Sequence, residues 1–363
     1  MKIEQISLTH YRNIDNLLIN FDTNVTVLVG ENGQGKTNIL EAIHYCSTSR
    51  SFRVKDDQLC IQHDQLLTRI IGIFEVNQIR KQLKIVINKD GKYLFENNKS
   101  FTTNKEFIGL VNTVLFSPYD LFLFDGSPKA RRRFIDTELS KLFPEFVNSL
   151  FNYNKLLKER NNTLKQSSVD KVYIETLDEQ LIMVSLIIIK YRRNFIHYIN
   201  KHIPKLFQDL VQEYNWEIEI SLESCVGDSE NVEEELRNLY KQALPKDLIF
   251  KSTQVGIHKD DLSVRINSQD IIQIASQGQK RMMIIALKLC LIQYIKEITK
   301  EYPILLLDDV FSEIDEAKRR RFIEFLPDTC QTIVTTTDRS HIQLWSKEKY
   351  SVLSVKNGEL VKE

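Results

Sequence analysis

Apolar positions in the first 100 residues follow the short period of β-strands. Spaced apolar residues occur over 3–8, and residues 25–29 (VTVLV) form a continuous β-branched run, which is typical of a strand buried on both faces. Residues 66–76 and 79–88 are strand-like, and Asp90-Gly91 is a hairpin signal before the next such run. We therefore expect a buried strand at 25–29 and an antiparallel β subdomain beside it.

The pattern becomes helical from Pro128 to Lys246. Glycine nearly disappears, and apolar residues recur at helical spacing through 128–164 and again through 170–202. The sequence SSVD at 167–170 separates the two runs. This pattern predicts a helical lobe inserted into the chain.

Strand and helix signals alternate again after Lys251. Residues 276–298 predict a long helix that is apolar on most faces and therefore buried, and residues 303–310 (PILLLDDV) predict a strand that ends in two acids. A further strand is expected at 331–338. The predicted fold class is α/β, with a head interrupted by the helical lobe. The predicted parts are the N-terminal part of the head, the lobe and the C-terminal part of the head, at 1–127, 128–246 and 247–363.

The composition argues against several classes of protein. Among 363 residues, 49 Lys and Arg balance 49 Asp and Glu, which excludes a uniformly basic nucleic-acid binder but allows a local basic patch. The five cysteines are scattered without a C-x-x-C pair, which argues against a disulfide framework or a zinc module. The N-terminus does not resemble a signal peptide, and no apolar stretch approaches the length of a membrane span. We expect a cytoplasmic globular protein with no membrane segment.

A glycine-rich segment follows the strand at 25–29. Residues 30–37 (GENGQGKT) fit G-x-x-x-x-G-K-[ST] between a buried strand and a helix, the context that a phosphate-binding loop requires. Glycine lets backbone N–H groups approach a triphosphate, and the helix that follows adds its positive end. Lys36 is expected to neutralise the β- and γ-phosphates, and Thr37 to bind Mg²⁺. The candidate ATP-binding residues here are Gly30, Glu31, Asn32, Gly33, Gln34, Gly35, Lys36, Thr37 and Asn38.

Asp308 and Asp309 end the predicted strand at 303–310. Ligands of parallel sheets bind at the carboxyl ends of the strands. Taken alone, a helix cap with a solvated neighbour explains two such acids equally well. Beside a phosphate-binding loop, Asp308 is the expected second ligand of Mg²⁺, and Asp309 is the expected acid that orients or deprotonates the attacking water.

Ser276 begins the long predicted helix with the sequence SQGQKR. A serine at this position is usually an N-cap and nothing more. In the order phosphate-binding loop, long insert, SxGQ and acidic strand end, however, the chain resembles the ABC-type ATPases. The resemblance implies that Ser276, with Gly278 and Gln279, contacts in trans the γ-phosphate held by a second subunit. ATP then holds a head-to-head homodimer together.

Two smaller segments fit the same resemblance. Residues 312–315 (SEID) stand where ABC-type ATPases have the D-loop, a contact across the dimer. Thr337 and Asp338 stand near the position of the switch residue, which is usually a histidine in the transporters. The switch role stays open between these two residues.

The whole chain also resembles the RecF family of bacterial ABC-type ATPases. Besides the nucleotide motifs, the segments that carry this resemblance are LTHYRNIDN and STSRSFR near the N-terminus, FSPYDL (116–121), DGSPKARRRFID (125–136) and GIHKDD (256–261). The sequence departs from the family pattern at Tyr119, Ile257 and Lys259.

The resemblance implies a function in recombinational repair and replication restart. It implies a weak ATPase that dimerises on ATP, binds double-stranded DNA near single-strand gaps, and helps RecO and RecR to load the RecA recombinase. Asp309 stands where most ABC-type ATPases have Glu, and the shorter side chain suggests slow turnover. The candidate phosphate contacts are the basic residues at 129–133, 318–321 and 50–53, with Arg12, although each cluster alone reads more simply as a solvated face.

Three alternatives differ in class. A monomeric P-loop ATPase or kinase for a small substrate would share the phosphate-binding loop but needs no SxGQ segment. A nuclease with an ABC-type head would need a second cluster of metal-binding acids, for which His258, Asp260 and Asp261 are the candidates. A purely structural binder fits poorly with an intact Lys36 and an intact acidic strand end.

Overall fold

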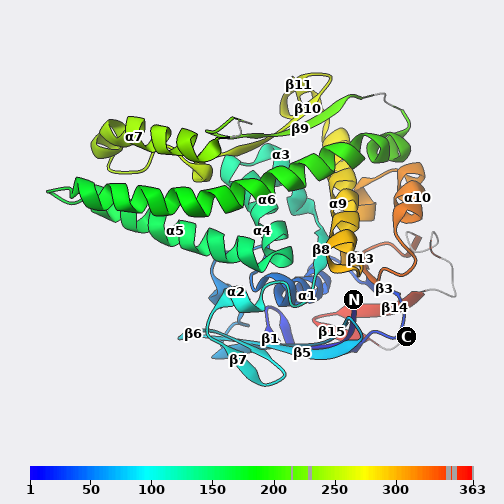
Figure 1. Cartoon of the computed structure of the whole chain (residues 1–363). Coiled ribbons are helices and arrows are strands. Elements are labelled where there is room, and N and C mark those ends of the chain that lie inside the picture. Colours follow the sequence, from blue (N-terminus) through cyan, green and yellow to red (C-terminus); the bar gives the residue numbers. More distant parts are fainter. Residues whose placement is uncertain (214–215, 228–230, 341–344, 346–349, 362–363) are drawn as a thin grey trace. The chain divides into compact units, whose positions relative to one another are not determined.

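The computed structural model describes residues 1–363 except 214–215, 228–230, 341–344, 346–349 and 362–363 (Figure 1). The chain divides into two compact units, each described here by itself. Unit 1 comprises Met1–Asp120, Lys205–Tyr214 and Ser276–Glu363, and unit 2 comprises Leu121–Pro204 and Asn215–Ala275. The boundaries at 127/128 and 246/247 that the sequence suggests stay a prediction.

A six-stranded, mainly parallel sheet is the centre of unit 1. Its order is β15-β14-β3-β13-β12-β8, and only β15, at the edge, is antiparallel to its neighbour. Every residue of β3, β12 and β13 is buried. The apolar runs of β3 and β12 predict this burial, whereas β13 also buries three threonines. The strands are β3 (Val25–Val29), β8 (Thr113–Phe116), β12 (Ile304–Asp308), β13 (Thr332–Thr336), β14 (Tyr350–Lys356) and β15 (Glu359–Val361).

The register of this sheet brings three strand ends together. Asp308 of β12 lies opposite Thr335 of β13, and Thr336 lies opposite Val29 of β3. Helix α1 begins directly after the loop that follows β3 and packs against the sheet (Figure 1). The helices that lie wholly in the described part of unit 1 include the buried helix α9; the bounds are α1 (Lys36–Thr48), α2 (Asn104–Phe107), α9 (Gln277–Thr299) and α10 (Glu316–Phe325).

The antiparallel subdomain predicted from the N-terminal pattern is present in unit 1. Its order is β2-β1-β4-β5-β6-β7, and residues of β4 and β5 alternate in burial, with apolar side chains facing the core. The turn between β5 and β6 consists of Lys89 and Asp90, and Gly91, with φ +142°, pairs with Asn88 as the first residue of β6. The strands are β1 (Lys2–Tyr11), β2 (Ile14–Asn20), β4 (Leu67–Val76), β5 (Ile79–Asn88), β6 (Gly91–Glu96) and β7 (Lys99–Phe101).

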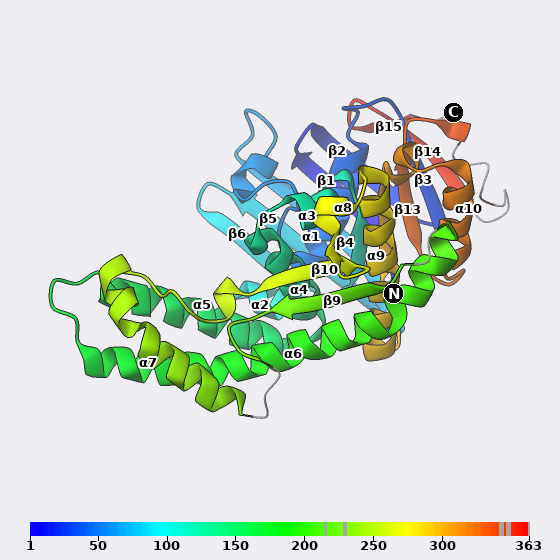
Figure 2. The same ribbon diagram turned by 90° about the horizontal axis from the view of Figure 1, so that it is seen from above.

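Unit 2 is mostly helical, as the middle of the sequence predicts. Helices α5 and α6 run side by side (Figures 1 and 2), and α6 has 41 residues, the last of which belong to unit 1. A small antiparallel sheet of order β11-β10-β9 completes unit 2. The elements are α3 (Phe122–Asp125), α4 (Pro128–Leu142), α5 (Pro144–Leu164), α6 (Lys171–Val211), β9 (Ile218–Glu223), α7 (Val232–Phe250), β10 (Asp261–Ile266), β11 (Gln269–Asp270) and α8 (Ile271–Ile274).

None of the described helices is both long enough and apolar enough to cross a bilayer.

Candidate active site

The glycine-rich loop between β3 and α1 has the conformation that its composition predicts. Gly33 and Gly35 have φ of +80° and +107°, which favour glycine, and Gly35 stands at the N-cap of α1. A Cβ atom on Gly30 would lie 2.3 Å from the carbonyl oxygen of Val355 in β14. The backbone of the loop therefore depends on glycine at these three positions.

The Lys36 side chain makes hydrogen bonds to the backbone of the glycine-rich loop. Its Nζ atom donates to the carbonyl oxygens of Gly30 and Glu31, at 2.5 and 2.7 Å. Burial lowers the pKa of Lys36, against the opposing effect of the nearby Asp309 and Asp308 carboxylates. The ammonium group thus lies inside the loop, where the phosphates of a nucleotide would meet it.

The loop also has supports on its outer side. The side chain of Gln34 accepts a hydrogen bond from the backbone N–H of Asn357, at 2.6 Å. Asn38 donates to the side chain of Asn13, at 2.7 Å, and Asn13 in turn donates to the carbonyl oxygen of Gly33. Glu31 and Asn32 are exposed.

Thr37 and Asp308 meet although 271 residues separate them. The Thr37 hydroxyl donates to Asp308 Oδ1 at 2.8 Å, and the same oxygen accepts from the Thr335 hydroxyl at 2.9 Å. Burial raises the pKa of Asp308, and these two hydrogen bonds oppose the rise. The pairing of these two residues that the motifs predict is present in the structure.

Asp309 lies beside this pair in a strained backbone conformation. Its φ is +51°, in the left-handed region, and its backbone N–H donates to the hydroxyl of Thr335 at 3.0 Å. Its Oδ1 atom is buried and has no hydrogen-bond partner among the described residues. A buried carboxylate oxygen without a donor is costly, and such groups concentrate at functional sites.

This group of oxygen atoms fits a magnesium ion. Mg²⁺ prefers hard oxygen ligands and binds proteins through one or two carboxylates, keeping several waters. The Thr37 hydroxyl and the Asp308 carboxylate are such ligands, and the orphaned Asp309 oxygen can accept a hydrogen bond from a water nearby.

A second buried network lies behind the loop, around Glu41 of α1. Arg12 donates from Nε and Nη2 to the two carboxylate oxygens of Glu41, at 3.0 and 2.7 Å, and Ser51 donates to Oε1 at 2.5 Å. Arg53 lies 3.7 Å from Glu41 and donates to Asn38. Two of the segments that resemble RecF, LTHYRNIDN and STSRSFR, therefore meet on α1.

Sequence reasoning did not identify Glu41 as a functional or structural centre. It stands among apolar residues of a predicted helix, and a carboxylate at such a position carries no signal until its partners are known. Arg12, which we considered as a phosphate contact, is instead engaged by this carboxylate, which is fully buried.

Ser276 forms a capping box at the start of α9. Its hydroxyl accepts from the N–H of Gln279 at 3.3 Å, and the Gln279 side chain accepts from the N–H of Ser276 at 2.8 Å. Gly278 is exposed, and a Cβ atom there would come no nearer than 4.0 Å to its closest recorded neighbour, the Ser276 oxygen. Ser276 thus caps α9 in the structure, and its contact with the γ-phosphate of a second subunit stays a prediction.

The segments after the two acids are organised by local hydrogen bonds. The Ser312 hydroxyl donates to the carbonyl oxygen of Asp309 at 2.8 Å, and Asp315 caps α10 through the N–H of Lys318. The Thr336 hydroxyl and the backbone of Asp338 exchange two hydrogen bonds of 3.1 Å. These contacts leave the switch role open between Thr337 and Asp338.

Several of the basic residues that we considered as DNA contacts have partners within the chain. Arg131 makes a bidentate pair with Asp261, with both bonds at 2.7 Å, and Arg132 donates to the carbonyl oxygen of Asp260. In α10, Lys318 pairs with Asp315, and the three arginines of the cluster donate to a carboxylate or to carbonyl oxygens. These clusters therefore give little independent support to a phosphate-tracking surface.

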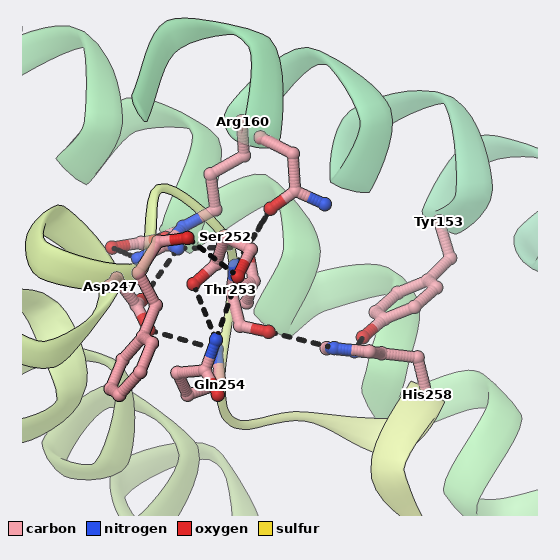
Figure 3. A network of polar contacts seen from close by, with 10 residues as sticks. Tyr153, Arg160, Asp247, Ser252, Thr253, Gln254 and His258 are labelled. Carbon is pink, nitrogen blue, oxygen red and sulfur yellow. Dashed lines mark hydrogen bonds and ion pairs between the residues drawn. The ribbon is translucent and has the colours of Figure 1, made fainter. Parts of the chain in front are cut away.

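The GIHKDD segment belongs to a buried polar network of unit 2. His258 Nδ1 accepts from the Tyr153 hydroxyl at 2.7 Å and its Nε2–H donates to the carbonyl oxygen of Thr253 at 3.2 Å (Figure 3). Burial lowers the pKa of His258 to about 4. A Cβ atom on Gly256, whose φ is +119°, would lie 2.7 Å from the Tyr240 hydroxyl.

Two fully buried arginines hold the rest of this network. Arg160 pairs with Asp178 at 2.5 Å and with Asp247 at 2.7 Å, as part of the network drawn in Figure 3. Arg192 pairs with Asp136 and with Asp260, both at 2.9 Å. No group of three or more His, Cys, Asp or Glu side chains in the described part of the chain could hold a metal ion, so the acids of GIHKDD do not form the cluster that a nuclease needs.

The fold and the site together define an ABC-type ATPase head, and the comparisons with known proteins agree. The model of the RecF/RecN/SMC N terminal domain family matches residues 2–360. The head of Smc bound to the C-winged helix domain of ScpA superposes with a TM-score of 0.56 at 16% identity, covering 99% of this chain and 98% of that one, which shows the fold alone.

Full-length relatives narrow the class. The DNA replication and repair protein RecF of Clostridium perfringens (strain SM101 / Type A) is 36% identical over 361 residues, and that of Streptococcus pneumoniae (strain P1031) is 34% identical over 362. These alignments cover 99% of this chain and 99% and 98% of the relatives. A solved RecF-ATP structure, described as a recombination mediator protein in the RecFOR pathway, has a TM-score of 0.90 at 29% identity and covers 99% of this chain and 97% of that one. The chain belongs to the RecF family.

Proposed function

We propose that the chain is an ATP-driven DNA clamp of recombinational repair and replication restart. ATP binding drives head-to-head dimerisation on double-stranded DNA near single-strand gaps, and slow hydrolysis releases the dimer. With RecO and RecR, the dimer helps to load the RecA recombinase. The family relationship and the ATP-bound relatives support this proposal.

One observation carries the nucleotide part of the proposal. The Thr37 hydroxyl, the Asp308 carboxylate and the orphaned Asp309 oxygen meet at one edge of the parallel sheet, next to a loop that encloses the Lys36 ammonium group. Phosphoryl transfer depends mainly on positioning and on charge stabilisation, which these groups supply.

Each residue then has a definable task. The backbone N–H groups of the loop and the Lys36 ammonium bind the β- and γ-phosphates, while Thr37 and Asp308 hold Mg²⁺. The bound Mg²⁺ neutralises charge on the phosphate oxygens. Asp309 accepts a hydrogen bond from the attacking water and takes its proton, and its short side chain favours slow turnover.

A glycine near the start of α9 supports the proposed dimerisation. A glycine inside a helix costs up to about 1 kcal/mol relative to alanine, yet neither the φ of Gly278 nor the space around it requires a glycine. A phosphate that approaches the exposed N-terminus of α9 from a second subunit would explain why this position has no side chain.

The experiment that tests the proposal is solution mass by light scattering, with Mg-ATP and with Mg-ADP. We expect the wild type to double its mass only with Mg-ATP, and Ser276→Arg to remain monomeric while still binding one ATP per chain. Ser276→Asp keeps a residue that caps helices equally well, but it places a carboxylate against the γ-phosphate, so it too should remain monomeric.

The control is Asn231→Arg, which removes the side-chain cap of a different helix, α7. This variant should dimerise normally. If ATP binds but the mass of the wild type does not respond to nucleotide, the proposed clamp function is wrong. The chain is then better explained as a monomeric ATPase or kinase. If Ser276→Asp dimerises like the wild type, the contact in trans is wrong.

A further inference from the structure

Thr335 lies beside Asp308 and Asp309, at the edge of the parallel sheet where we propose that the nucleotide binds, which we call the nucleotide edge. No sequence motif assigns a role to this residue. It is the fourth residue of β13, is about 1% exposed, and lies opposite Asp308 in the register of the sheet. The sequence directed attention to Thr337 and Asp338, two and three residues later. A threonine in a buried strand is ordinary, so only its contacts distinguish it.

The Thr335 hydroxyl makes two hydrogen bonds, one to each acid of the site. It donates its single proton to Asp308 Oδ1 at 2.9 Å and accepts the backbone N–H of Asp309 at 3.0 Å. One buried hydroxyl therefore joins the proposed Mg²⁺ ligand to the proposed water-orienting residue.

The first hydrogen bond fixes the orientation of the Asp308 carboxylate. Asp308 Oδ1 accepts from Thr335 on one side and from Thr37 on the other. Because both donors act on the same oxygen, rotation of the carboxylate about its last bond would break two hydrogen bonds at once.

The second hydrogen bond fixes the backbone of Asp309. The left-handed φ of +51° is unfavourable for a residue with a side chain, and such conformations persist where the surroundings hold them. The hydroxyl of Thr335 holds the N–H of this residue directly, and the backbone conformation determines where the Asp309 carboxylate lies.

We propose that Thr335 is the positioning residue of this site: its hydroxyl sets the Asp308 carboxylate for Mg²⁺ and holds Asp309 in the backbone conformation that aims its carboxylate. The inference rests on the proposed ATPase function. Thr335 itself touches neither the nucleotide nor the water; it acts through the two acids.

The same strand offers a matched control. Thr332 is buried to the same extent, but its hydroxyl donates to the carbonyl oxygen of Cys330 at 3.3 Å, at the other end of β13. Thr332→Val and Thr335→Val each replace a buried hydroxyl by a methyl group of similar size, so their effects on packing are alike. Only Thr335→Val removes contacts to the two acids.

The first readout is steady-state ATP hydrolysis. We expect Thr335→Val to lower turnover about 100-fold, the order of loss that a misplaced reactive group causes, and Thr332→Val to change it less than about 3-fold. Thr335→Ser keeps the hydroxyl and should stay within about 5-fold of the wild type. If Thr335→Val does not fold, Thr335→Ser and Thr335→Cys form a second pair, which differs in the strength of the hydrogen bond, and Cys should be the slower.

The second readout is nucleotide affinity, measured with a fluorescent ATP analogue in EDTA and then in Mg²⁺. Thr335→Val should bind the analogue like the wild type in EDTA, because the loop and Lys36 are unchanged. The gain in affinity on adding Mg²⁺ should fall several-fold. Thr332→Val should keep the full gain.

The outcomes separate this inference from the proposed function. If the wild type hydrolyses ATP and Thr335→Val matches Thr332→Val in both readouts, the positioning role is wrong while the ATPase stands. The role is also wrong if Thr335→Ser is as slow as Thr335→Val. A wild type that binds no ATP overturns the proposed function, and the role of Thr335 with it.

Discussion

Two of the sites at which the molecule buries charge differ in how completely the charges are paired. In unit 2, Arg160 and Arg192 are fully buried, and each is paired with two carboxylates at 2.5 to 2.9 Å. At the nucleotide edge of unit 1, Asp308 has only hydroxyl donors and one Asp309 oxygen has no partner among the described residues. Complete pairing indicates a structural task, whereas incomplete pairing indicates that a ligand supplies the missing partner.

This difference explains why two groups of family motifs play different parts. The motifs around the phosphate-binding loop bring together groups that are incompletely paired, while GIHKDD and RRRFID bring charged partners together inside unit 2. A segment that resembles a family motif is thus not by itself an active-site segment.

The largest effect on stability should come from breaking the completely paired charges of unit 2. We expect Arg160→Ala to lower the free energy of unfolding by about 3–5 kcal/mol, because it leaves Asp178 and Asp247 buried without a cation. Urea unfolding followed by circular dichroism measures this. Arg237→Ala is the control: its pairs with Glu179 and Glu233 are about half exposed, so water screens them and their loss should lower the free energy of unfolding much less. Equal losses in the two variants would contradict the contrast.

The opposite test removes charge from the incompletely paired site. Asp309→Asn should reduce ATP turnover by about 100-fold or more and hold the dimer in its ATP-bound form, because the water loses its proton acceptor. Asparagine tolerates the left-handed φ of +51°, so the free energy of unfolding should stay equal or rise. Single-turnover hydrolysis and urea unfolding check the two halves of this prediction. Unchanged turnover would move the base to another residue.

Acid should weaken unit 2 through His258. Its pKa is about 4 in the folded chain against 6.5 for an ordinary histidine, so the unfolded chain takes up the proton first as the pH falls. The contribution of the neutral ring is complete above about pH 6.5 and is lost as the pH falls toward 4. We expect a loss of about 2 kcal/mol, reduced from the full linkage value because the ring is partly exposed. In His258→Asn this part of the pH dependence of unfolding should disappear, and its persistence would show that another group titrates.

The smallest expected change in stability comes from a substitution at Gly278, which should affect stability and dimerisation in opposite directions. Gly278→Ala should raise the free energy of unfolding by up to about 1 kcal/mol, because helices favour alanine and the added methyl group has space. The same methyl group should obstruct the phosphate of the second subunit and abolish the ATP-dependent doubling of mass. Gly227→Ala, at another glycine with open space around it, should leave dimerisation intact. A Gly278→Ala variant that dimerises normally would contradict the close approach.

The sequence predicted the parts of the molecule whose signals are local. The buried run at 25–29, the glycine-rich loop and the acidic strand end each combine a composition with a context, and the structure brings Lys36, Thr37, Asp308 and Asp309 together as expected. The spacing of apolar residues likewise predicted that the middle of the chain is helical.

The remaining features depend on contacts between residues far apart in the chain. Arg12 and Glu41 are 29 residues apart, and neither position signals its partner. The basic run at 129–133 looks like a solvent-facing cluster until Asp260 and Asp261 are placed against it. Thr335 is an ordinary strand residue by sequence, and only the register with Asp308 reveals its position.

The strand order also has a consequence for how the protein is made. Strand β3, which leads into the phosphate-binding loop, has β13 and β14 as its two neighbours, and these are among the last segments to be translated. Roughly 300 residues separate β3 from β13, which at ordinary rates of synthesis means a delay on the order of 15 to 60 s. During that time the loop lacks both strands that flank β3 in the finished sheet. We therefore expect a chain that ends before β13 to lack a stable nucleotide site.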